Sequence, residues 1–363
     1  MNRAFALALG VLAVTASSST LGQNAPARNL EIHWVDVEGG AATLFVSPTG
    51  ESLLLDTGYP GNGDRDAKRI FAAAQKAGLR QIDHVVISHW HGDHVGGLEA
   101  LSKMIPLGKF YDHGDGVEQA DRARLEGYKA IAGAKRTIVK GGDTIPFSGG
   151  TVRVLISEGP VIGTPINGGG SNPLCTNAVR QEPAGAENIR MVALSLTYGD
   201  FKFASLGDAD WSREMELACP VNKLGTVNVY TINRHGGLDN SGAPALLGAI
   251  RPQVIVVNNG PRKGLGATDD RTRVINTPGT APYEKNAYLR MKGTQGVEDV
   301  WQGHLSMIDS NPAHNTSRDM IANLEDNTVD HPGNAISASV GRDGRFTITN
   351  SRTGFSKTYT VRK

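Results

Sequence analysis

Three histidines and an aspartate fall within the six residues HWHGDH, which begin at His89. His89 and His91 are two positions apart, so their side chains project to the same side of an extended segment. Gly92 allows the backbone to turn, which directs Asp93 and His94 back toward the same point. Imidazole suits Zn²⁺ and related ions, and a carboxylate can serve a harder ion beside them. Because the whole chain has only 10 histidines, this clustering predicts a metal-binding site.

Strands and helices must position this segment. The sequence DHVVISH at 83–89 predicts a short buried strand that leads into it, and GGLEALSKMIP at 96–106 predicts a helix that follows. Upstream, apolar and alternating runs predict three strands at 29–37, 41–48 and 52–58. A helix is expected next, over DAKRIFAAAQKAG, with its glycine as the stop.

The second half of the chain repeats this alternation of strands and helices. Strands are expected at 191–199, 201–208, 227–232 and 253–259, with helices at 211–219 and 243–250. Two sheets, each covered by helices, would bury these patterns, so we expect an α/β (α+β) fold in four αββα layers. The Gly-, Pro- and Asn-rich stretch at 159–187 predicts a long loop of functional or inserted character.

The motif and its neighbours resemble the metallo-β-lactamase superfamily. HWHGDH is similar to the HxHxDH motif of that family, and the LLLDTG strand with Asp56 lies upstream, as the family places it. FKFASLGDAD resembles the strand that ends in a metal-bridging aspartate, here Asp208. The later segment around His235 is similar to the HHGS-type loop of the ComEC/Rec2-like branch. The resemblance extends from about Leu30 to His304 and implies the four-layer sandwich.

The resemblance also implies a centre of two divalent metal ions, with Zn²⁺ expected and Mn or Fe as alternatives. The implied ligands are His89 and His91 for the first ion and Asp93, His94 and His235 for the second, with Asp208 bridging both. Asp56 is implied to orient ligands from behind through hydrogen bonds. Structural alternatives remain for three of them: Asp208 could cap the helix near Trp211, His235 could be exposed, and Asp56 could serve only its turn.

The sequence departs from the family pattern on the side of the first metal. The third histidine expected ahead of the bridging aspartate is absent, and Asn188 stands nearest to that place as a weak, neutral ligand. His113 and His304 are the other candidates, with structural or substrate-facing roles as alternatives. Where the paired-histidine loop has its first histidine, this chain has Arg234, which we expect to contact substrate. Arg234 could also join Arg251, Arg262 and Lys263 in holding a phosphate, unless these are ordinary surface charges.

The chemistry that follows is hydrolysis by a metal-bound hydroxide, with Asp93, Asp208 and His235 in catalytic roles and Asp93 or a bound water protonating the leaving group. We expect a secreted hydrolase acting on a small phosphodiester or related ester. One alternative is a β-lactam or lactone hydrolase, and another is a catalytically weak metal-binding protein. With 37 Lys and Arg against 36 Asp and Glu, the composition gives no strong signal for nucleic acid as a partner.

The predicted organisation has four parts. Residues 1–23, with one basic residue and a short apolar run, predict a secretory signal peptide rather than an uncleaved anchor. A metallo-β-lactamase-like catalytic domain is expected over 28–305, an Asn- and Ser-rich linker over 306–332, and a C-terminal β-hairpin extension over 333–363. The mature protein is therefore expected to be periplasmic or secreted, without a membrane segment.

The chain has two cysteines, Cys175 and Cys219. In an exported chain with an even number of cysteines a disulfide is expected, with two buried thiols as the alternative. Closing that loop would contribute about 4 kcal/mol in the chain-entropy treatment.

Overall fold

The computed structural model of the 363-residue chain describes residues 28–237, 240–267, 274–275, 283–309, 311–325 and 331–362. The expected signal peptide at 1–23 lies outside the described residues. Among the helices of these ranges, none is long and apolar enough to cross a membrane.

Nine strands of the described chain form the first sheet, in the order β19-β18-β17-β1-β2-β3-β4-β5-β6. Their bounds are β1 Leu30–Trp34, β2 Thr43–Val46, β3 Ser52–Leu55, β4 Ile82–Val86, β5 Leu107–Asp112, β6 Arg136–Ile138, β17 Ile336–Val340, β18 Arg345–Asn350 and β19 Ser356–Thr360. From β3 to β6 the strands run parallel, so the carboxyl ends of β3 and β4 lie at the same edge.

Eight strands form the second sheet, in the order β16-β15-β13-β12-β11-β10-β8-β7, within the part of the chain that is described. Their bounds are β7 Thr144–Ile145, β8 Thr151–Ile156, β10 Ala193–Tyr198, β11 Phe201–Ser205, β12 Val229–Thr231, β13 Val254–Val257, β15 Asp299–His304 and β16 Ile321–Asn323. The strands β11, β12 and β13 are parallel, so the loops that follow them leave from one edge. A separate pair joins β9 (Arg180–Gln181) to β14 (Val274–Ile275).

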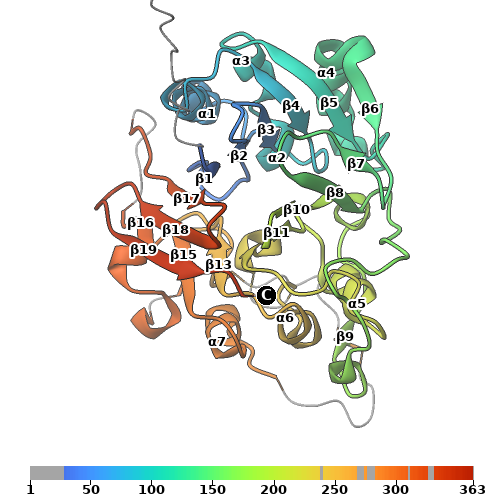
Figure 1. The fold of residues 1–363 in the computed structure, drawn as a ribbon. Coiled ribbons are helices and arrows are strands. Elements are labelled where there is room, and N and C mark those ends of the chain that lie inside the picture. Colours follow the sequence, from blue (N-terminus) through green and yellow to red (C-terminus); the bar gives the residue numbers. More distant parts are fainter. Residues whose placement is uncertain are drawn as a thin grey trace, which may run out of the picture.

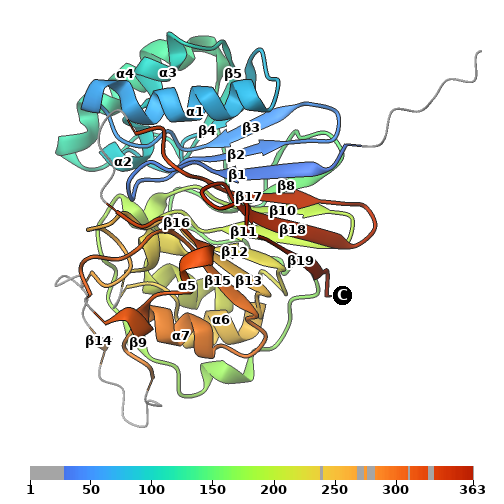
Figure 2. The same ribbon diagram turned by 90° about the vertical axis from the view of Figure 1, so that its left-hand side faces the viewer.

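The two sheets lie face to face, and helices cover their outer faces (Figure 1 and Figure 2). The first sheet is covered by α1 (Arg65–Lys76), α2 (Gly92–Val95), α3 (Leu98–Ser102) and α4 (Arg122–Ala132), and the second by α5 (Trp211–Ala218), α6 (Pro244–Ile250) and α7 (Ala287–Gly293). Helix α1 shows why: Ala67, Ile70 and Ala74 are buried at helical spacing and form one apolar stripe. The expected four-layer αββα sandwich is confirmed.

The apolar layer between the sheets fixes their relative position. Phe45 of β2 and Phe203 of β11 pack edge to face with ring centroids 5.2 Å apart. Trp34 of β1 donates a hydrogen bond from Nε1 to Thr231 Oγ1 of β12 at 2.8 Å. Burying a large side chain of this kind stabilises the fold by about 2–3 kcal/mol. The sheets are thus held so that strand ends from both reach one place.

The C-terminal strands are an integral part of the first sheet. The expected hairpin is present as β17 and β18, and β17 pairs antiparallel with β1, from Leu30 opposite Val340 to Trp34 opposite Ile336. The expected linker differs from the observed structure, because β16 within it pairs parallel with β15. A three-residue strand among Asn, Ser and Asp has too short an alternation to be read from sequence.

The expected disulfide is present. Cys175 and Cys219 are bonded with an S–S distance of 2.04 Å and a Cα–Cα distance of 5.6 Å. The bond ties the long loop to the residue that follows α5. Asn172 reinforces the junction by donating from Nδ2 to the carbonyls of Ala218 and Ala245. Helix α5 begins just after Asp208, so the disulfide anchors an element next to the predicted site.

Candidate metal centre

The predicted metal-binding residues follow the carboxyl ends of parallel strands in both sheets. Asp56 comes directly after β3, and HWHGDH begins three residues after β4 ends. Asp208 follows β11, and His235 follows β12. Because neighbouring parallel strands end at one edge, loops distant in sequence meet between the two sheets.

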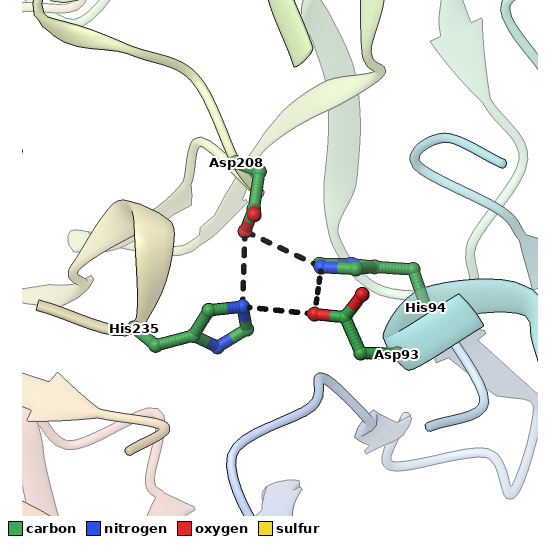
Figure 3. Close-up of side chains that lie close together, drawn as sticks. All are labelled: Asp93, His94, Asp208 and His235. Carbon is green, nitrogen blue, oxygen red and sulfur yellow. Dashed lines mark ion pairs between the residues drawn. The ribbon is translucent and has the colours of Figure 1, made fainter. Parts of the chain in front are cut away.

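Four of these side chains form a compact cluster, shown in Figure 3. Nε2 of His94 lies 3.3 Å from Asp93 Oδ2 and 3.3 Å from Asp208 Oδ1. Nε2 of His235 lies 3.3 Å from the same two oxygens. The four ligand atoms all lie within 4.8 Å of one another, which is the arrangement expected of a cation site.

The donor set fits a divalent ion. Two imidazole nitrogens and two carboxylate oxygens are ligand types that Zn²⁺ takes, and each nitrogen lies 3.3 Å from both oxygens. Within the described chain, Nε2 of His94 and Nε2 of His235 are buried and make no hydrogen bond of good geometry. A buried polar atom left so costs about 1–3 kcal/mol, which a bound cation would offset.

Hydrogen bonds from behind set the orientation of both imidazoles. Asp56 Oδ2 lies 2.8 Å from His94 Nδ1, and Asp56 also accepts hydrogen bonds from the amide and hydroxyl of Ser88, each at 2.7 Å. Nδ1 of His235 lies 3.2 Å from the carbonyl oxygen of Asn258, to which it can donate. A proton held on Nδ1 leaves Nε2 free to bind a metal. Asp56 therefore lies where the resemblance implies an orienting carboxylate.

The loop that carries His235 is held in an unusual backbone conformation. Arg234 and His235 both have positive φ, 48° and 55°, inside the short 3₁₀ helix Asn233–Gly236. Such strain in consecutive non-glycine residues costs of order 1–3 kcal/mol each and persists only where surrounding structure fixes it. Part of that structure is Gly264, since a Cβ there would lie 2.2 Å from the carbonyl oxygen of His235.

The charges in the cluster are complementary. Burial alone would raise the pKa of Asp208, but the adjacent His235 and His94 hold it well below its usual range. Asp93 behaves likewise: burial opposes its charge, yet His94, His235 and Lys263 keep its pKa well below the ordinary value. Both carboxylates are thus ionised at neutral pH and suited to a cation.

The first-metal side is less complete. His89 Nε2 and His91 Nδ1 lie 3.0 Å apart, so the two imidazoles converge as the motif predicts. Burial, with the charge of His94, lowers the pKa of His89 well below its usual value, which keeps the ring neutral. Nε2 of His91 points the other way, 3.4 Å from Glu118 Oε2 and 3.7 Å from Asp121 Oδ2.

The segment that contains Asn188 runs beside this side of the site. The amide of Val192 donates to the carbonyl of Ser88, and Glu187 Oε1 accepts from the amide of Trp90. Asn188 is buried, and its Oδ1 has no hydrogen-bond partner among the residues described. Its role as a weak ligand stays a prediction, supported by this placement. His113 instead binds Glu187, with Nε2 2.9 Å from Oε1, and both side chains are fully buried.

The structure places His304 outside the four-residue cluster. Its Nε2 lies 2.7 Å from Asp36 Oδ1, and Asp36 is also bound by Arg69 at 3.0 Å. This group links β15 to the turn after β1. His304 therefore has a structural partner, in line with the structural role given above as an alternative to metal binding. Trp90 likewise packs, with its ring 4.8 Å from that of Tyr128.

Two residues outside the predicted ligand set, Lys263 and Tyr59, lie against the cluster. Lys263 forms an ion pair with Asp93 Oδ2, and its Nζ donates to the hydroxyl of Tyr59 at 2.8 Å. Lys263 was one of four cations weighed as a phosphate site, but nothing in the sequence separated it from the others. Tyr59 had no signal, because it lies 204 residues from its partner.

The fold and the cluster together define a class: an αββα sandwich with a candidate His and Asp metal site where strand ends of its two sheets meet. Residues 35–173 match the sequence profile of the metallo-beta-lactamase superfamily. This part of the chain, which holds the HWHGDH segment, is therefore similar to the metallo-beta-lactamase superfamily.

Two curated proteins with similar sequence have names that describe hydrolases. An atrochrysone carboxyl ACP thioesterase of Aspergillus fumigatus is 28% identical over 120 residues, which are 33% of this chain and 24% of that protein. A metal-dependent hydrolase of Herpetosiphon aurantiacus is 27% identical over 139 residues, or 36% of this chain and 54% of that protein. The chain thus spans about a quarter to a half of the length of these relatives.

Among solved structures, the metallo-beta-lactamase fold protein YhfI from Bacillus subtilis is similar, with a TM-score of 0.45 and 12% identity. The superposition covers 76% of this chain and 96% of that one.

Proposed function

We propose that this chain is a metal-dependent hydrolase whose divalent ion is held by Asp93, His94, Asp208 and His235. The observation that carries the proposal is the pair of buried imidazole Nε2 atoms, each 3.3 Å from the same two carboxylate oxygens. His89 and His91 converge beside this cluster and would bind a second ion, with Asn188 as the weak third ligand. Zn²⁺ is the expected ion, since the donors are imidazole nitrogen and carboxylate oxygen.

A divalent ion bound in this place would supply Lewis-acid chemistry, activating water near neutral pH and polarising the oxygen of the scissile group. The chain's own residues prepare the site for it. Asp56 keeps a proton on Nδ1 of His94, and the carbonyl of Asn258 does so for His235. Because the pKa of Asp93 is held well below its ordinary value, Asp93 stays a carboxylate and is suited to a ligand role. This disfavours Asp93 as the acid that protonates the leaving group.

The proposed substrate is a phosphodiester or related ester, and membership of the ComEC/Rec2-like branch is part of the same proposal. Support comes from Lys263, a cation that pairs with Asp93, and from Arg234, a buried residue that directly precedes His235 in the chain. A β-lactam or lactone hydrolase would use the same cluster and differ only in substrate. We also propose that the protein is exported, since the bonded Cys175 and Cys219 suit an oxidising compartment.

The test is metal analysis of the purified protein with a hydrolysis panel of bis-p-nitrophenyl phosphate, single-stranded DNA, nitrocefin and a lactone. We expect stoichiometric zinc and turnover of the phosphodiester. Asp208→Ala and His235→Ala should lose the tightly bound ion and the activity together. His314→Ala is the matched control, because His314 pairs with Asp309 and is not part of the cluster.

If the protein hydrolysed only nitrocefin, the proposed substrate class would change from a phosphodiester to a β-lactam. A full metal content without turnover of any compound would identify a catalytically weak metal-binding protein. Full metal content in Asp208→Ala would refute the ligand assignment itself.

A further inference from the structure

Lys263 is held against the cluster by a rigid turn after β13. The amide of Gly260 donates to the carbonyl of Lys263 at 3.0 Å, which closes the turn. A Cβ on Gly260 would lie 2.4 Å from the carbonyl oxygen of Glu38, and one on Gly264 would lie 2.2 Å from that of His235. The backbone on both sides of Lys263 thus packs so closely against other backbone that only glycine fits at 260 and 264. This packing fixes the backbone position of Lys263 beside His235.

The ammonium group of Lys263 directly contacts one of the proposed ligand atoms. Lys263 Nζ contacts Oδ2 of Asp93, the same oxygen that lies 3.3 Å from Nε2 of His94 and of His235. The Lys263 side chain is 37% exposed, so solvent and small solutes reach it. Anything bound to this ammonium would therefore lie next to the ion.

Tyr59 completes the arrangement from the first sheet. Its hydroxyl accepts a hydrogen bond from Lys263 at 2.8 Å, so its own O–H must be directed elsewhere. Lys263 has three N–H groups, and within the described chain two are used, by Asp93 and Tyr59. One N–H and one O–H thus remain beside the cluster, a donor pair suited to two oxygens of a single anionic group.

We propose that Lys263 and Tyr59 form a binding site for the anionic group of the substrate, which is a phosphate-bearing ester. This rests on the proposed hydrolase function and narrows its substrate to esters whose negatively charged oxygens adjoin the scissile bond. Lys263 and Tyr59 bind two of these oxygens and so hold the ester next to the ion. A neutral ester would make no such contact with the ammonium.

The opposing possibility is that Lys263 serves only to hold Asp93 in place. Four variants separate the two roles: Lys263→Met, Lys263→Arg, Tyr59→Phe and the control Lys357→Met. Lys357 is closely matched, since it pairs with Asp299, contacts the ring of Tyr359 with Nζ 5.2 Å from the centroid, and is 40% exposed. It lies on β19, away from the strand ends that form the cluster.

The first readout is binding of inorganic phosphate to the zinc-loaded protein, measured by calorimetry with zinc content determined on the same samples. Lys263→Met should bind phosphate about tenfold or more weakly, from the loss of one charge-assisted hydrogen bond, with zinc content unchanged. Lys263→Arg should retain most of the binding, Tyr59→Phe should lose a smaller part, and Lys357→Met should match the wild type.

The second readout compares bis-p-nitrophenyl phosphate with the neutral p-nitrophenyl acetate. In Lys263→Met, KM for the phosphodiester should rise by a clearly larger factor than KM for the neutral acetate. Wild-type phosphate affinity in Lys263→Met, or loss of zinc together with phosphate, would overturn the anion site. If the wild type hydrolyses nothing, the hydrolase proposal fails, but phosphate binding still decides the anion site separately.

Discussion

Asp56→Asn tests whether the carboxylate behind His94 sets its metal-binding state. In the structure Asp56 Oδ2 lies 2.8 Å from His94 Nδ1, and both oxygens of Asp56 also accept hydrogen bonds from Ser88 at 2.7 Å. Asparagine keeps the shape but has only one acceptor oxygen. If that oxygen stays with the Ser88 amide, an NH₂ group faces Nδ1 of His94, which must then become an acceptor.

An imidazole that accepts at Nδ1 carries its proton on Nε2, the atom that faces Asp93 and Asp208. That tautomer cannot bind a metal through Nε2. Loss of an orienting partner of this kind typically weakens metal binding 10- to 100-fold, which corresponds to about 1.4–2.7 kcal/mol. We therefore expect Asp56→Asn to raise the zinc Kd by about this factor.

The assay is zinc competition against a chromophoric chelator, with thermal unfolding measured on the same preparations. Asp112→Asn is the control for burying an amide in place of a carboxylate, because Asp112 is fully buried and binds Tyr128 and Arg136 instead. It should lose stability but keep its zinc affinity. An Asp56→Asn protein that folds normally and binds zinc as tightly as the wild type would refute the tautomer argument.

Three further predictions concern stability and the asymmetry of the site. Replacing Cys175 and Cys219 by serine should lower the free energy of unfolding by about 4 kcal/mol, measured by denaturant titration, since the bond closes a loop with a sequence separation of 44. Burial raises the pKa of Glu214 from 4.5 to about 7, so the native state binds the extra proton and stability should fall as pH rises from about 4.5 to 7, by about 3 kcal/mol at most. In Glu214→Gln that slope should disappear from unfolding curves taken across this range; an unchanged slope would assign it to other groups. Finally, His89→Ala should keep one tightly bound zinc per chain while His235→Ala loses it, in equilibrium dialysis; equal losses would mean that the two sides are equally strong.

The parts of the fold that could be predicted are those with local signals. The strands β1 to β4 and helix α1 were expected from runs of apolar residues, and the hairpin of β17 and β18 from its Gly-Arg-Asp-Gly turn. The pairing of β17 with β1 joins residues some 300 positions apart in the register Leu30 to Val340, and no local pattern specifies it. The short strand β16 was not predicted because three residues carry too little alternation.

The site divides in a similar way. The HWHGDH segment predicts metal binding from its residue types and spacing alone. Asp208 and His235 could be placed only by resemblance to a family in which the order of the ligands is known. Lys263 and Tyr59 belong to no motif. Their contact joins residues 204 positions apart, so the sequence could not predict that they lie together at the site.

That contact also bears on why one side of the site can be incomplete. Asp93, His94, Asp208 and His235 bring four donor atoms within 4.8 Å of one another, whereas in the described part of the chain His89 and His91 have only His94, already part of that cluster, as a neighbouring imidazole. A second ion commonly helps to bind and polarise the substrate's oxygens. Here Lys263 holds its positive charge beside Asp93. In the proposed anion site, that charge would bind the substrate's oxygens with no further ligand from the protein. Under the proposed function, the absent third histidine and the ammonium of Lys263 have one explanation: a single tightly bound ion and a lysine would together attract the anionic substrate.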